Sequence, residues 1–211
     1  DLDLKRFNDQ PKWLAGYSDI TTLLTHVYTT LGIAGIHSPM CSAITPETEG
    51  AQQIRKLREL LTGTPASYEV DPNPLDIAGL GTGILVGGNL SLLVNLSGTS
   101  SRPDTRGKIL LLEDTGEYRY VVDRMMQNLR RSGWLEPLAG MVVGSFTDFR
   151  DTDTPFGMTE HELIRELVKG YGYPVAFGFP SGHQLENFPL KIGVPHHLNV
   201  GGGKTLLKEL T

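Results

Sequence analysis

The feature that most restricts the fold of this chain is a short apolar run followed at once by a helical pattern. Residues 13–17 follow a proline and predict a short buried strand. From Ile20 onward, apolar residues recur at helical spacing as far as Leu31, and Gly32 is placed to end that helix. Ser18 therefore lies where a strand turns into a helix.

The position of Ser18 has two interpretations. A hydroxyl at a helix N-terminus lies beside free backbone N–H groups and the positive end of the helix dipole, which is what a serine nucleophile requires. Gly16 permits a tight turn before it, and we expect Asp19 to cap the first turn. Serine and aspartate are also the commonest helix caps, and the second glycine of the Gly-x-Ser-x-Gly pattern is absent. Taken alone, the local sequence favours the cap.

Composition excludes several kinds of partner and site. With 19 basic and 24 acidic side chains, a net charge of −5 and no basic stripe, we expect no nucleic-acid partner and no anionic membrane surface. No stretch approaches the roughly 20 uninterrupted apolar residues of a membrane span, and no signal-peptide pattern is present. The single cysteine, Cys41, excludes an internal disulfide and a cysteine-cluster metal site, and we expect it to be buried.

The rest of the chain alternates strand-like and helix-like segments, which is typical of an α/β fold with a parallel sheet. Further strands are expected near residues 32–40, 138–147 and 175–179, and further helices at 48–61, 121–131 and 159–171. Turn-forming composition over residues 62–79 predicts a domain boundary. We place it at residue 70, which gives an N-terminal domain of residues 1–70 and a C-terminal domain of residues 71–211.

The glycines of residues 79–88 also have two interpretations. A phosphate-binding loop would require a following Gly-Lys-Ser/Thr, and a dinucleotide-binding motif would require a third glycine where Val86 stands. Tight backbone packing at a strand-to-helix turn fits this segment better. Asn89 is then expected to cap the next helix and to lie at a domain junction.

Two further segments supply candidate catalytic groups. An apolar strand that begins near Lys108 ends in Glu113 and Asp114, and open α/β sheets place their sites at that edge. From local sequence alone, a solvated strand end is the more frequent outcome. A later strand leads into Pro180-Ser-Gly, so His183 is expected on a turn, where a catalytic base is exposed to substrate.

Other histidines leave a metal site open as an alternative. His196 and His197 lie in a strand-like stretch, where adjacent side chains point to opposite faces and make poor joint ligands. Together with His183 they could form a zinc site, although no His-x-x-x-His or cysteine pairing supports one.

Ser18, Glu113 and His183 follow the chain order of α/β-hydrolase triads. Six blocks of sequence extend this pattern along nearly the whole chain: Pro-Lys-Trp-Leu-Ala-Gly-Tyr-Ser-Asp-Ile-Thr at 11–21, Ile-His-Ser-Pro at 36–39, Gly-Gly-Asn-Leu-Ser-Leu-Leu at 87–93, Leu-Glu-Asp-Thr-Gly-Glu at 112–117, Gly-Ser-Phe-Thr-Asp at 144–148 and Pro-Ser-Gly-His at 180–183. With these blocks the chain resembles the LD-carboxypeptidases, a family of serine peptidases that includes muramoyltetrapeptide carboxypeptidases and microcin C immunity peptidases.

The resemblance implies a fold and a mechanism. It implies an α/β protein with a partial flavodoxin-like N-terminal domain that carries Ser18, and a C-terminal swivelling β/α domain that carries Glu113 and His183. Ser18 would be the nucleophile, His183 the base and Glu113 its orienting acid, with the backbone N–H of Asp19 in the oxyanion hole and no metal or organic cofactor. Family members carry further βα units and an Arg-Gly-Gly-Tyr-Gly-like loop before the position of residue 1, so we expect the first βα units to be absent here.

The resemblance also implies a substrate. The expected reaction releases terminal D-Ala from muropeptide tetrapeptides during cytoplasmic peptidoglycan recycling, carried out by a homodimer. Four arginines are available for the substrate carboxylate, each of them more often a surface or ion-pair residue: Arg102, Arg106, Arg119 and Arg124. One alternative is an immunity-type peptidase that hydrolyses an aminoacyl-nucleotide amide, although the segment between residues 39 and 87 is short for a nucleotide-stacking loop. The other is a non-catalytic peptide-binding protein.

Overall fold

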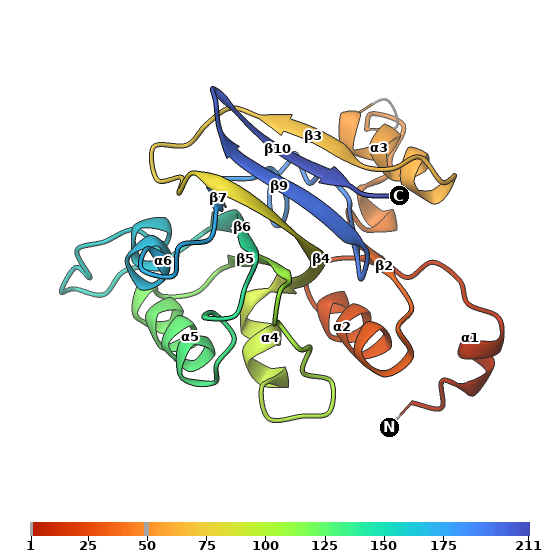
Figure 1. The fold of residues 1–211 in the computed structure, drawn as a ribbon, viewed down its shortest axis with the longest axis horizontal. Helices are drawn as coiled ribbons and strands as arrows, with labels where there is room; N and C mark the ends of the chain where they lie inside the picture. Colours follow the sequence, from red (N-terminus) through yellow and green to blue (C-terminus); the bar gives the residue numbers. More distant parts are fainter. Residues whose placement is uncertain (1, 49–50) are drawn as a thin grey trace.

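A computed structural model describes residues 2–48 and 51–211 and confirms the α/β class. The chain forms two sheets (Figure 1). The smaller sheet contains, in spatial order, β1 (Ala15–Gly16), β2 (Gly35–His37) and β8 (Leu190–Ile192). The larger sheet contains, in spatial order, β3 (Ser67–Val70), β10 (Lys204–Glu209), β9 (Pro195–Gly201), β4 (Gly79–Asn89), β5 (Ile109–Thr115), β6 (Gly140–Thr147) and β7 (Val175–Phe177). The helices are α1 (Lys5–Asp9), α2 (Ile20–Leu31), α3 (Gln52–Leu61), α4 (Leu90–Leu96), α5 (Arg119–Arg131) and α6 (Glu160–Val168), with a 3-10 turn η1 (Cys41–Ala43).

Strand β4 joins two differently built halves of the larger sheet. Its first residues pair antiparallel with β9, and from Leu85 onward it pairs parallel with β5. Glycines allow this close approach, because a Cβ at Gly81 would lie 2.2 Å from the Ala139 carbonyl oxygen and a Cβ at Gly87 would lie 2.1 Å from that of Leu111. The glycine-rich segment is therefore explained by backbone packing, as predicted.

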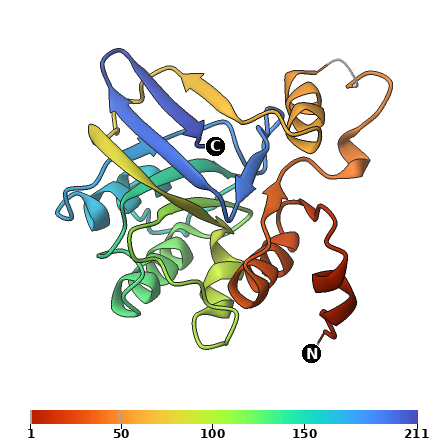
Figure 2. The same cartoon turned by 45° about the vertical axis from the view of Figure 1, so that its right-hand side comes forward.

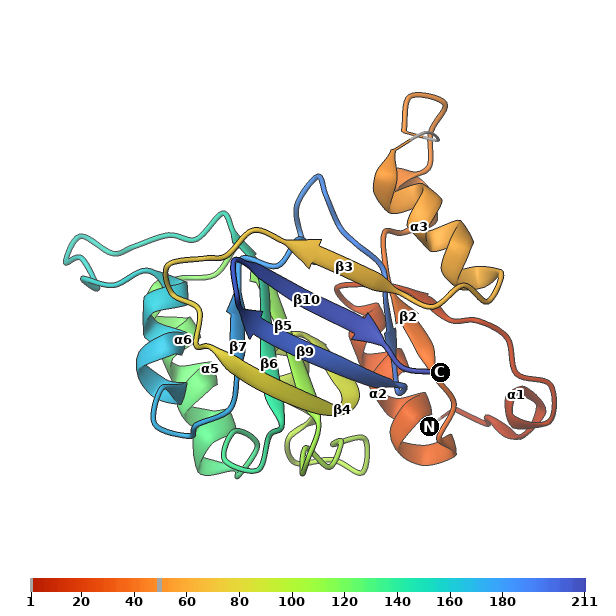
Figure 3. The same cartoon turned by 45° about the horizontal axis from the view of Figure 1, so that its top comes forward.

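Helices cover one face of the parallel half of this sheet. Figure 1 shows α4, α5 and α6 side by side below β4 to β7, and their apolar residues form one core around the fully buried Trp134. On the other face, residues of β5 to β7 pack against residues of β9, β10 and β3. Figures 2 and 3 show these antiparallel strands lying across the parallel strands of the same sheet. The carboxyl ends of β5, β6 and β7 therefore emerge at one edge, between two cores.

Helix termini follow the local sequence closely. Gly32 ends α2 with a left-handed backbone (φ 68°), and its N–H donates to the Tyr28 carbonyl. Thr159 and Glu162 form a reciprocal capping box at the start of α6. The side chain of Asn89 accepts from the Leu92 N–H and caps α4, as predicted.

Strand pairing crosses residue 70 in both directions. β3 ends at that residue but pairs with β10, whereas β8 follows it but pairs with β2. The division into domains 1–70 and 71–211 stays a prediction.

Three local predictions are wrong or reduced. Only two residues of the expected strand at 13–17 pair as β1, and Trp13 is 44% exposed, with its ring beneath the Lys191 ammonium at 5.7 Å. Cys41 is exposed because it lies in the short turn η1 outside both cores. The helix predicted at 48–61 begins, within the described residues, at Gln52.

Among the helices described here, none combines the length and apolarity that crossing a bilayer would require.

Candidate active site

Ser18 occupies a strained turn between β1 and α2. Its φ of 58° lies in the left-handed region, which non-glycine residues rarely adopt. The Ser18 carbonyl accepts the Thr21 N–H at 2.9 Å, so the chain enters the helix immediately. A Cβ at Gly16 would lie 2.8 Å from the Ile20 side chain, which explains the glycine on the strand side of the turn. Such outliers persist where the surrounding structure fixes them, and they cluster at active sites.

Asp19 does not act as the predicted side-chain cap. It precedes α2 with helical backbone angles (φ −54°, ψ −29°) and makes no side-chain cap hydrogen bond, because capping side chains require an extended backbone at that position. Its N–H belongs to the first helical turn, whose donors have no acceptor inside the helix. The residue after Ser18 therefore offers a backbone donor rather than a cap.

Glu113 and His183 form a close pair at the edge of the parallel sheet. His183 Nδ1 donates to Glu113 Oε2 at 2.7 Å, and the Glu113 side chain is fully buried while that of His183 is 19% exposed. Burial of the imidazole lowers its pKa, but the hydrogen bond to Glu113 and the charges of Glu113 and Asp114 outweigh this effect, so the pKa of His183 is raised.

A register shift between β5 and β6 aims Glu113 at this position. Leu112 pairs with Val143 and Asp114 pairs with Phe146, so Gly144 and Ser145 together lie opposite Glu113. Such bulges re-aim side chains and are frequent next to active sites.

The turn that carries His183 is packed against Glu113 and anchored to β6. A Cβ at Gly182 would lie 2.7 Å from Glu113 Oε2, so only glycine fits there. The Gly182 N–H donates to Asn187 Oδ1 at 2.9 Å, and the Thr147 hydroxyl donates to the His183 carbonyl at 3.0 Å. His183 is therefore presented on a turn, as predicted.

Tyr17 brings the serine turn and the histidine together. Its ring lies 4.6 Å from the His183 ring, centroid to centroid, at an interplanar angle of 60°. Because Tyr17 immediately precedes Ser18, this contact brings the strained turn close to His183.

Asp114 is buried and structural. Its carboxylate accepts from Asn89 Nδ2 and from the Ser91 and Thr115 N–H groups, all at 2.9–3.0 Å. Burial raises its pKa to about 6 against the opposing effect of these donors. The Asn89 N–H donates to Thr21 Oγ1 at 3.1 Å, so this cluster ties β4, β5 and α4 to α2. The predicted junction role of Asn89 is consistent with that tie.

His37 is a further residue near the candidate site, and no role for it was predicted from the sequence. It lies at the end of β2, pairs with Gly16 in the ladder and is fully buried. Burial lowers its pKa, the charge of Glu113 raises it and His183 lowers it, with a lowered pKa as the result. Its place in the Ile-His-Ser-Pro block was the one sign of it in the sequence.

The alternative zinc ligands do not converge. His196 is buried, with Nδ1 3.0 Å from the Val194 carbonyl oxygen, whereas His197 Nδ1 lies 3.0 Å from Thr82 Oγ1. Across residues 2–48 and 51–211, we find no group of three or more His, Cys, Asp or Glu side chains that could hold a metal ion.

Three of the four candidate carboxylate-binding arginines have other partners. Arg119 forms ion pairs with Asp151 and Glu160. Arg102 lies over the Trp134 ring and Arg124 over the Tyr120 ring.

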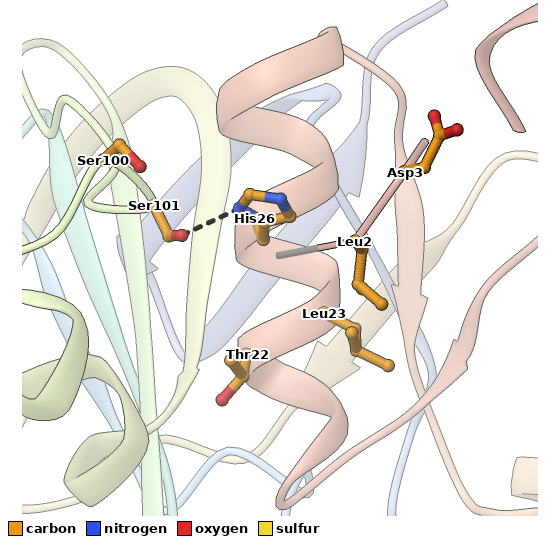
Figure 4. A pocket seen from close by; sticks show the side chains of 7 residues that line it. All are labelled: Leu2, Asp3, Thr22, Leu23, His26, Ser100 and Ser101. Atoms are coloured by element: carbon orange, nitrogen blue, oxygen red, sulfur yellow. Dashed lines mark hydrogen bonds between the residues drawn. The ribbon is translucent and has the colours of Figure 1, made fainter. Parts of the chain in front are cut away.

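A second serine–histidine pair lies in a pocket of about 650 Å³ beside α2 (Figure 4). His26 Nδ1 lies 2.8 Å from Ser101 Oγ. Within the part of the chain that the structure describes, no carboxylate hydrogen-bonds to His26, and in Figure 4 the Asp3 carboxylate points away from it. This pair lacks the acid that orients a catalytic histidine.

Comparison with known sequences decides the family. The model of the LD-carboxypeptidase N-terminal domain matches residues 1–38, and that of the C-terminal domain matches residues 82–198, which is more than half of the chain. The chain belongs to the LD-carboxypeptidase family. All three members of the Ser18, Glu113 and His183 set lie inside the matched ranges.

Two curated relatives of this LD-carboxypeptidase-family chain carry murein-related names. A probable murein peptide carboxypeptidase of Bacillus subtilis (strain 168) is 32% identical over 206 residues, which cover 94% of this chain and 63% of the relative. A murein tetrapeptide carboxypeptidase of Pseudomonas aeruginosa is 31% identical over 189 residues, covering 84% of this chain and 59% of the relative. The chain thus spans about 60% of the length of these relatives.

Solved structures share the fold of this family member. The crystal structure of a muramoyltetrapeptide carboxypeptidase from Oxalobacter formigenes matches with a TM-score of 0.88 and 29% identity, covering 100% of this chain and 72% of that one. MccF in complex with glutamyl sulfamoyl guanosine matches with a TM-score of 0.82 at 21% identity, covering 99% of this chain and 71% of that one, which shows a shared fold.

Proposed function

We propose that this member of the LD-carboxypeptidase family is a serine peptidase that cleaves the L,D amide bond releasing terminal D-Ala from muropeptide tetrapeptides. The observation that carries the proposal is the buried Glu113–His183 pair, with a 2.7 Å hydrogen bond, packed through Tyr17 against the strained turn at Ser18. The murein substrate is supported by the names of the relatives.

In the proposed mechanism, Ser18 Oγ attacks the carbonyl carbon of the scissile amide while His183 Nε2 takes the hydroxyl proton. The Asp19 N–H donates to the oxyanion of the tetrahedral intermediate. His183 then gives the proton to the nitrogen of the leaving D-Ala, which leaves an ester on Ser18. Water, deprotonated by His183, hydrolyses that ester and restores the serine.

Glu113 prepares His183 for both proton transfers. Its hydrogen bond to Nδ1 selects the tautomer that leaves Nε2 free as a base, and its charge stabilises the imidazolium that forms. This stabilisation also accounts for the direction of the His183 pKa, which is raised despite burial of the ring.

The test is release of D-Ala from L-Ala-γ-D-Glu-meso-diaminopimelate-D-Ala by the wild-type protein, Ser18→Ala and Ser101→Ala. We expect release by the wild type and by Ser101→Ala, which removes the hydroxyl of the second serine–histidine pair. Ser18→Ala is expected to lose about 10⁴-fold or more of kcat.

Other outcomes of the same test separate the alternatives. No release by the folded wild type, with cleavage of an aminoacyl-nucleotide amide instead, would replace the muropeptide substrate. Binding of the tetrapeptide without cleavage of either compound would favour the peptide-binding alternative. A cytoplasmic location and a homodimer remain predictions, and sedimentation at several concentrations tests the second.

A further inference from the structure

The carboxylate of Glu113 and two neighbouring side chains, Ser145 and His37, have buried polar atoms without a hydrogen-bond partner. Buried side-chain atoms without a hydrogen-bond partner include Glu113 Oε1, Ser145 Oγ and both ring nitrogens of His37. Each unpaired buried group costs roughly 1–3 kcal/mol, so a cluster of them requires a reason. All three residues lie on strands that reach the proposed active site: β5, β6 and β2.

The geometry brings Ser145 to the Glu113 carboxylate. The register shift places Ser145 opposite Glu113 across the β5–β6 ladder. Ser145 Oγ and Glu113 Oε2 lie 2.6 and 2.7 Å, respectively, from the same point, which is where a Cβ of Gly182 would stand. Rotation of the Ser145 hydroxyl group about χ1, or one bridging water, is enough to connect it to this carboxylate.

His37 approaches the pair from the smaller sheet. Its ring meets Tyr17 edge-on at 6.2 Å, and Tyr17 in turn lies against His183. Glu113 and His183 are both close enough to change the pKa of His37. Burial lowers the pKa of His37, which favours the neutral imidazole with one N–H to donate.

We propose that Ser145 and His37 are positioning residues for the carboxylate of Glu113. This inference rests on the proposed function. In this arrangement the Ser145 hydroxyl and the His37 N–H supply donors to the carboxylate in addition to His183 Nδ1, which donates to Oε2. With these donors the carboxylate stays aimed at the imidazole.

The sign of the expected effect follows from the shared proton of the pair. The donors favour a charged Glu113, and they favour it most when His183 is neutral and the pair holds no proton. Removing a donor therefore disfavours this fully deprotonated state more than any state in which the pair holds a proton. The pKa at which the pair loses its last proton therefore rises. The other titratable groups that face the pair are Asp114 of β5, Tyr17 before α2 and His161 of α6, whose Nε2 lies 3.3 Å from the Gly144 carbonyl oxygen.

The experiment is an NMR titration of the His183 imidazole in the wild type, Ser145→Ala and His37→Phe, with D-Ala release measured as kcat/KM against pH. Ser97→Ala and His196→Phe are matched controls, because each removes a buried and unpartnered Ser or His atom elsewhere. His37→Asn retains an N–H donor and is the conservative variant.

We expect the pKa of His183 to move up by about one unit in Ser145→Ala and in His37→Phe, because hydrogen bonds to charged groups contribute about 1.5–3 kcal/mol. The acid limb of kcat/KM should move with it. Both controls should titrate as the wild type does, and His37→Asn should lie close to it.

A His183 pKa that is the same in the wild type, Ser145→Ala and His37→Phe would overturn the inference. Ser145→Ala removes a single oxygen, so it keeps the test decisive if His37→Phe fails to fold. The NMR readout needs no turnover. An absence of D-Ala release by the wild type would therefore count against the proposed function, whereas an unmoved pKa would count against the positioning role.

Discussion

Ser18 and the Glu113–His183 pair are positioned by opposite means. Ser18 follows a strand of two residues in a three-stranded sheet, and its position is set by its own backbone, with a φ of 58°. Glu113 lies in the seven-residue strand β5 beside the eight-residue β6, inside a continuous core. Its orientation is set by a bulge, by the missing side chain of Gly182 and by His183.

This difference means that the two regions should fail in different ways. Changes near Ser18 should act locally, by relieving or adding backbone strain. Changes near Glu113 should act through several elements at once, because β5, β6 and the turn before β8 all meet at that carboxylate.

Among changes near Glu113, the largest expected effect is that of Glu113→Gln. The amide is close in shape to the carboxylate but cannot stabilise an imidazolium or enforce the same tautomer, so we expect kcat/KM to fall by about 10⁴-fold. Steady-state kinetics measures this loss of activity, and thermal unfolding measures any change in stability separately. Glu209→Gln is the control. Glu209 is also a buried acid, but its carboxylate forms an ion pair with Lys191 at 2.8 Å and makes no contact with His183. Equal activity of wild type and Glu113→Gln would contradict the role of Glu113.

Gly182→Ala should damage both stability and activity. The added Cβ would lie 2.6 Å from Ser145 Oγ and 2.7 Å from Glu113 Oε2, at a φ of 114° that alanine avoids. We expect a loss of about 2–4 kcal/mol in the free energy of unfolding and about 10²-fold in kcat. Gly170→Ala is the control, because a Cβ there meets nothing within 4 Å. Similar losses in both variants, in urea unfolding and in kinetics, would show that the crowding at Gly182 is unimportant.

Asp114→Asn should change how stability depends on pH. Because burial raises the pKa of Asp114 to about 6 from 3.8, the folded chain holds a proton that the unfolded chain has released between these values. The contribution of Asp114 to the free energy of unfolding is therefore fully present below about pH 4 and falls as the pH rises through 6. The difference in the free energy of unfolding between wild type and Asp114→Asn, measured with urea, should decrease by about 1–2 kcal/mol from pH 4 to pH 7.

The exposed Asp153 provides the matching control for that titration. Asp153→Asn should leave the pH dependence of wild-type stability unchanged. A flat difference between wild type and Asp114→Asn would mean that the three donors to Asp114 offset the cost of burying its charge.

The smallest expected change in stability is a gain. Ser18→Gly removes the cost of a left-handed non-glycine residue and should raise the free energy of unfolding by about 1 kcal/mol while abolishing turnover. Asp148, the other described non-glycine residue with positive φ (56°), offers the comparison. Asp148→Gly should give a similar gain, measured by urea unfolding, and keep its activity. A loss of stability in Ser18→Gly would show that the turn is not strained.

The same contrast explains how much could be predicted from the sequence. The Ser18 turn, the Gly32 terminus and the Asn89 cap depend on residues close together in the chain, so local patterns were enough. The side-chain cap by Asp19 failed because the left-handed backbone of Ser18 places Asp19 already in helical geometry.

Contacts across the fold could not be predicted in that way. The hydrogen bond from His183 to Glu113 joins residues 70 positions apart, and local sequence favoured a solvated end for β5. Its burial depends on the bulge in β6 and on the Gly182 turn, neither of which has a strong local signal. His37 and Ser145 were missed for the same reason, since each reaches the site from a different strand.

The most direct test of the account is labelling by a serine-directed fluorophosphonate, with the modified peptide identified by mass spectrometry. If Glu113 and His183 activate Ser18, the wild type should carry the adduct on Ser18, with a rate that rises as the pH passes through the His183 pKa. His183→Gln should react more slowly than the wild type by at least about 10³-fold. An adduct on Ser101, or an unreactive Ser18 in the folded wild type, would contradict the account.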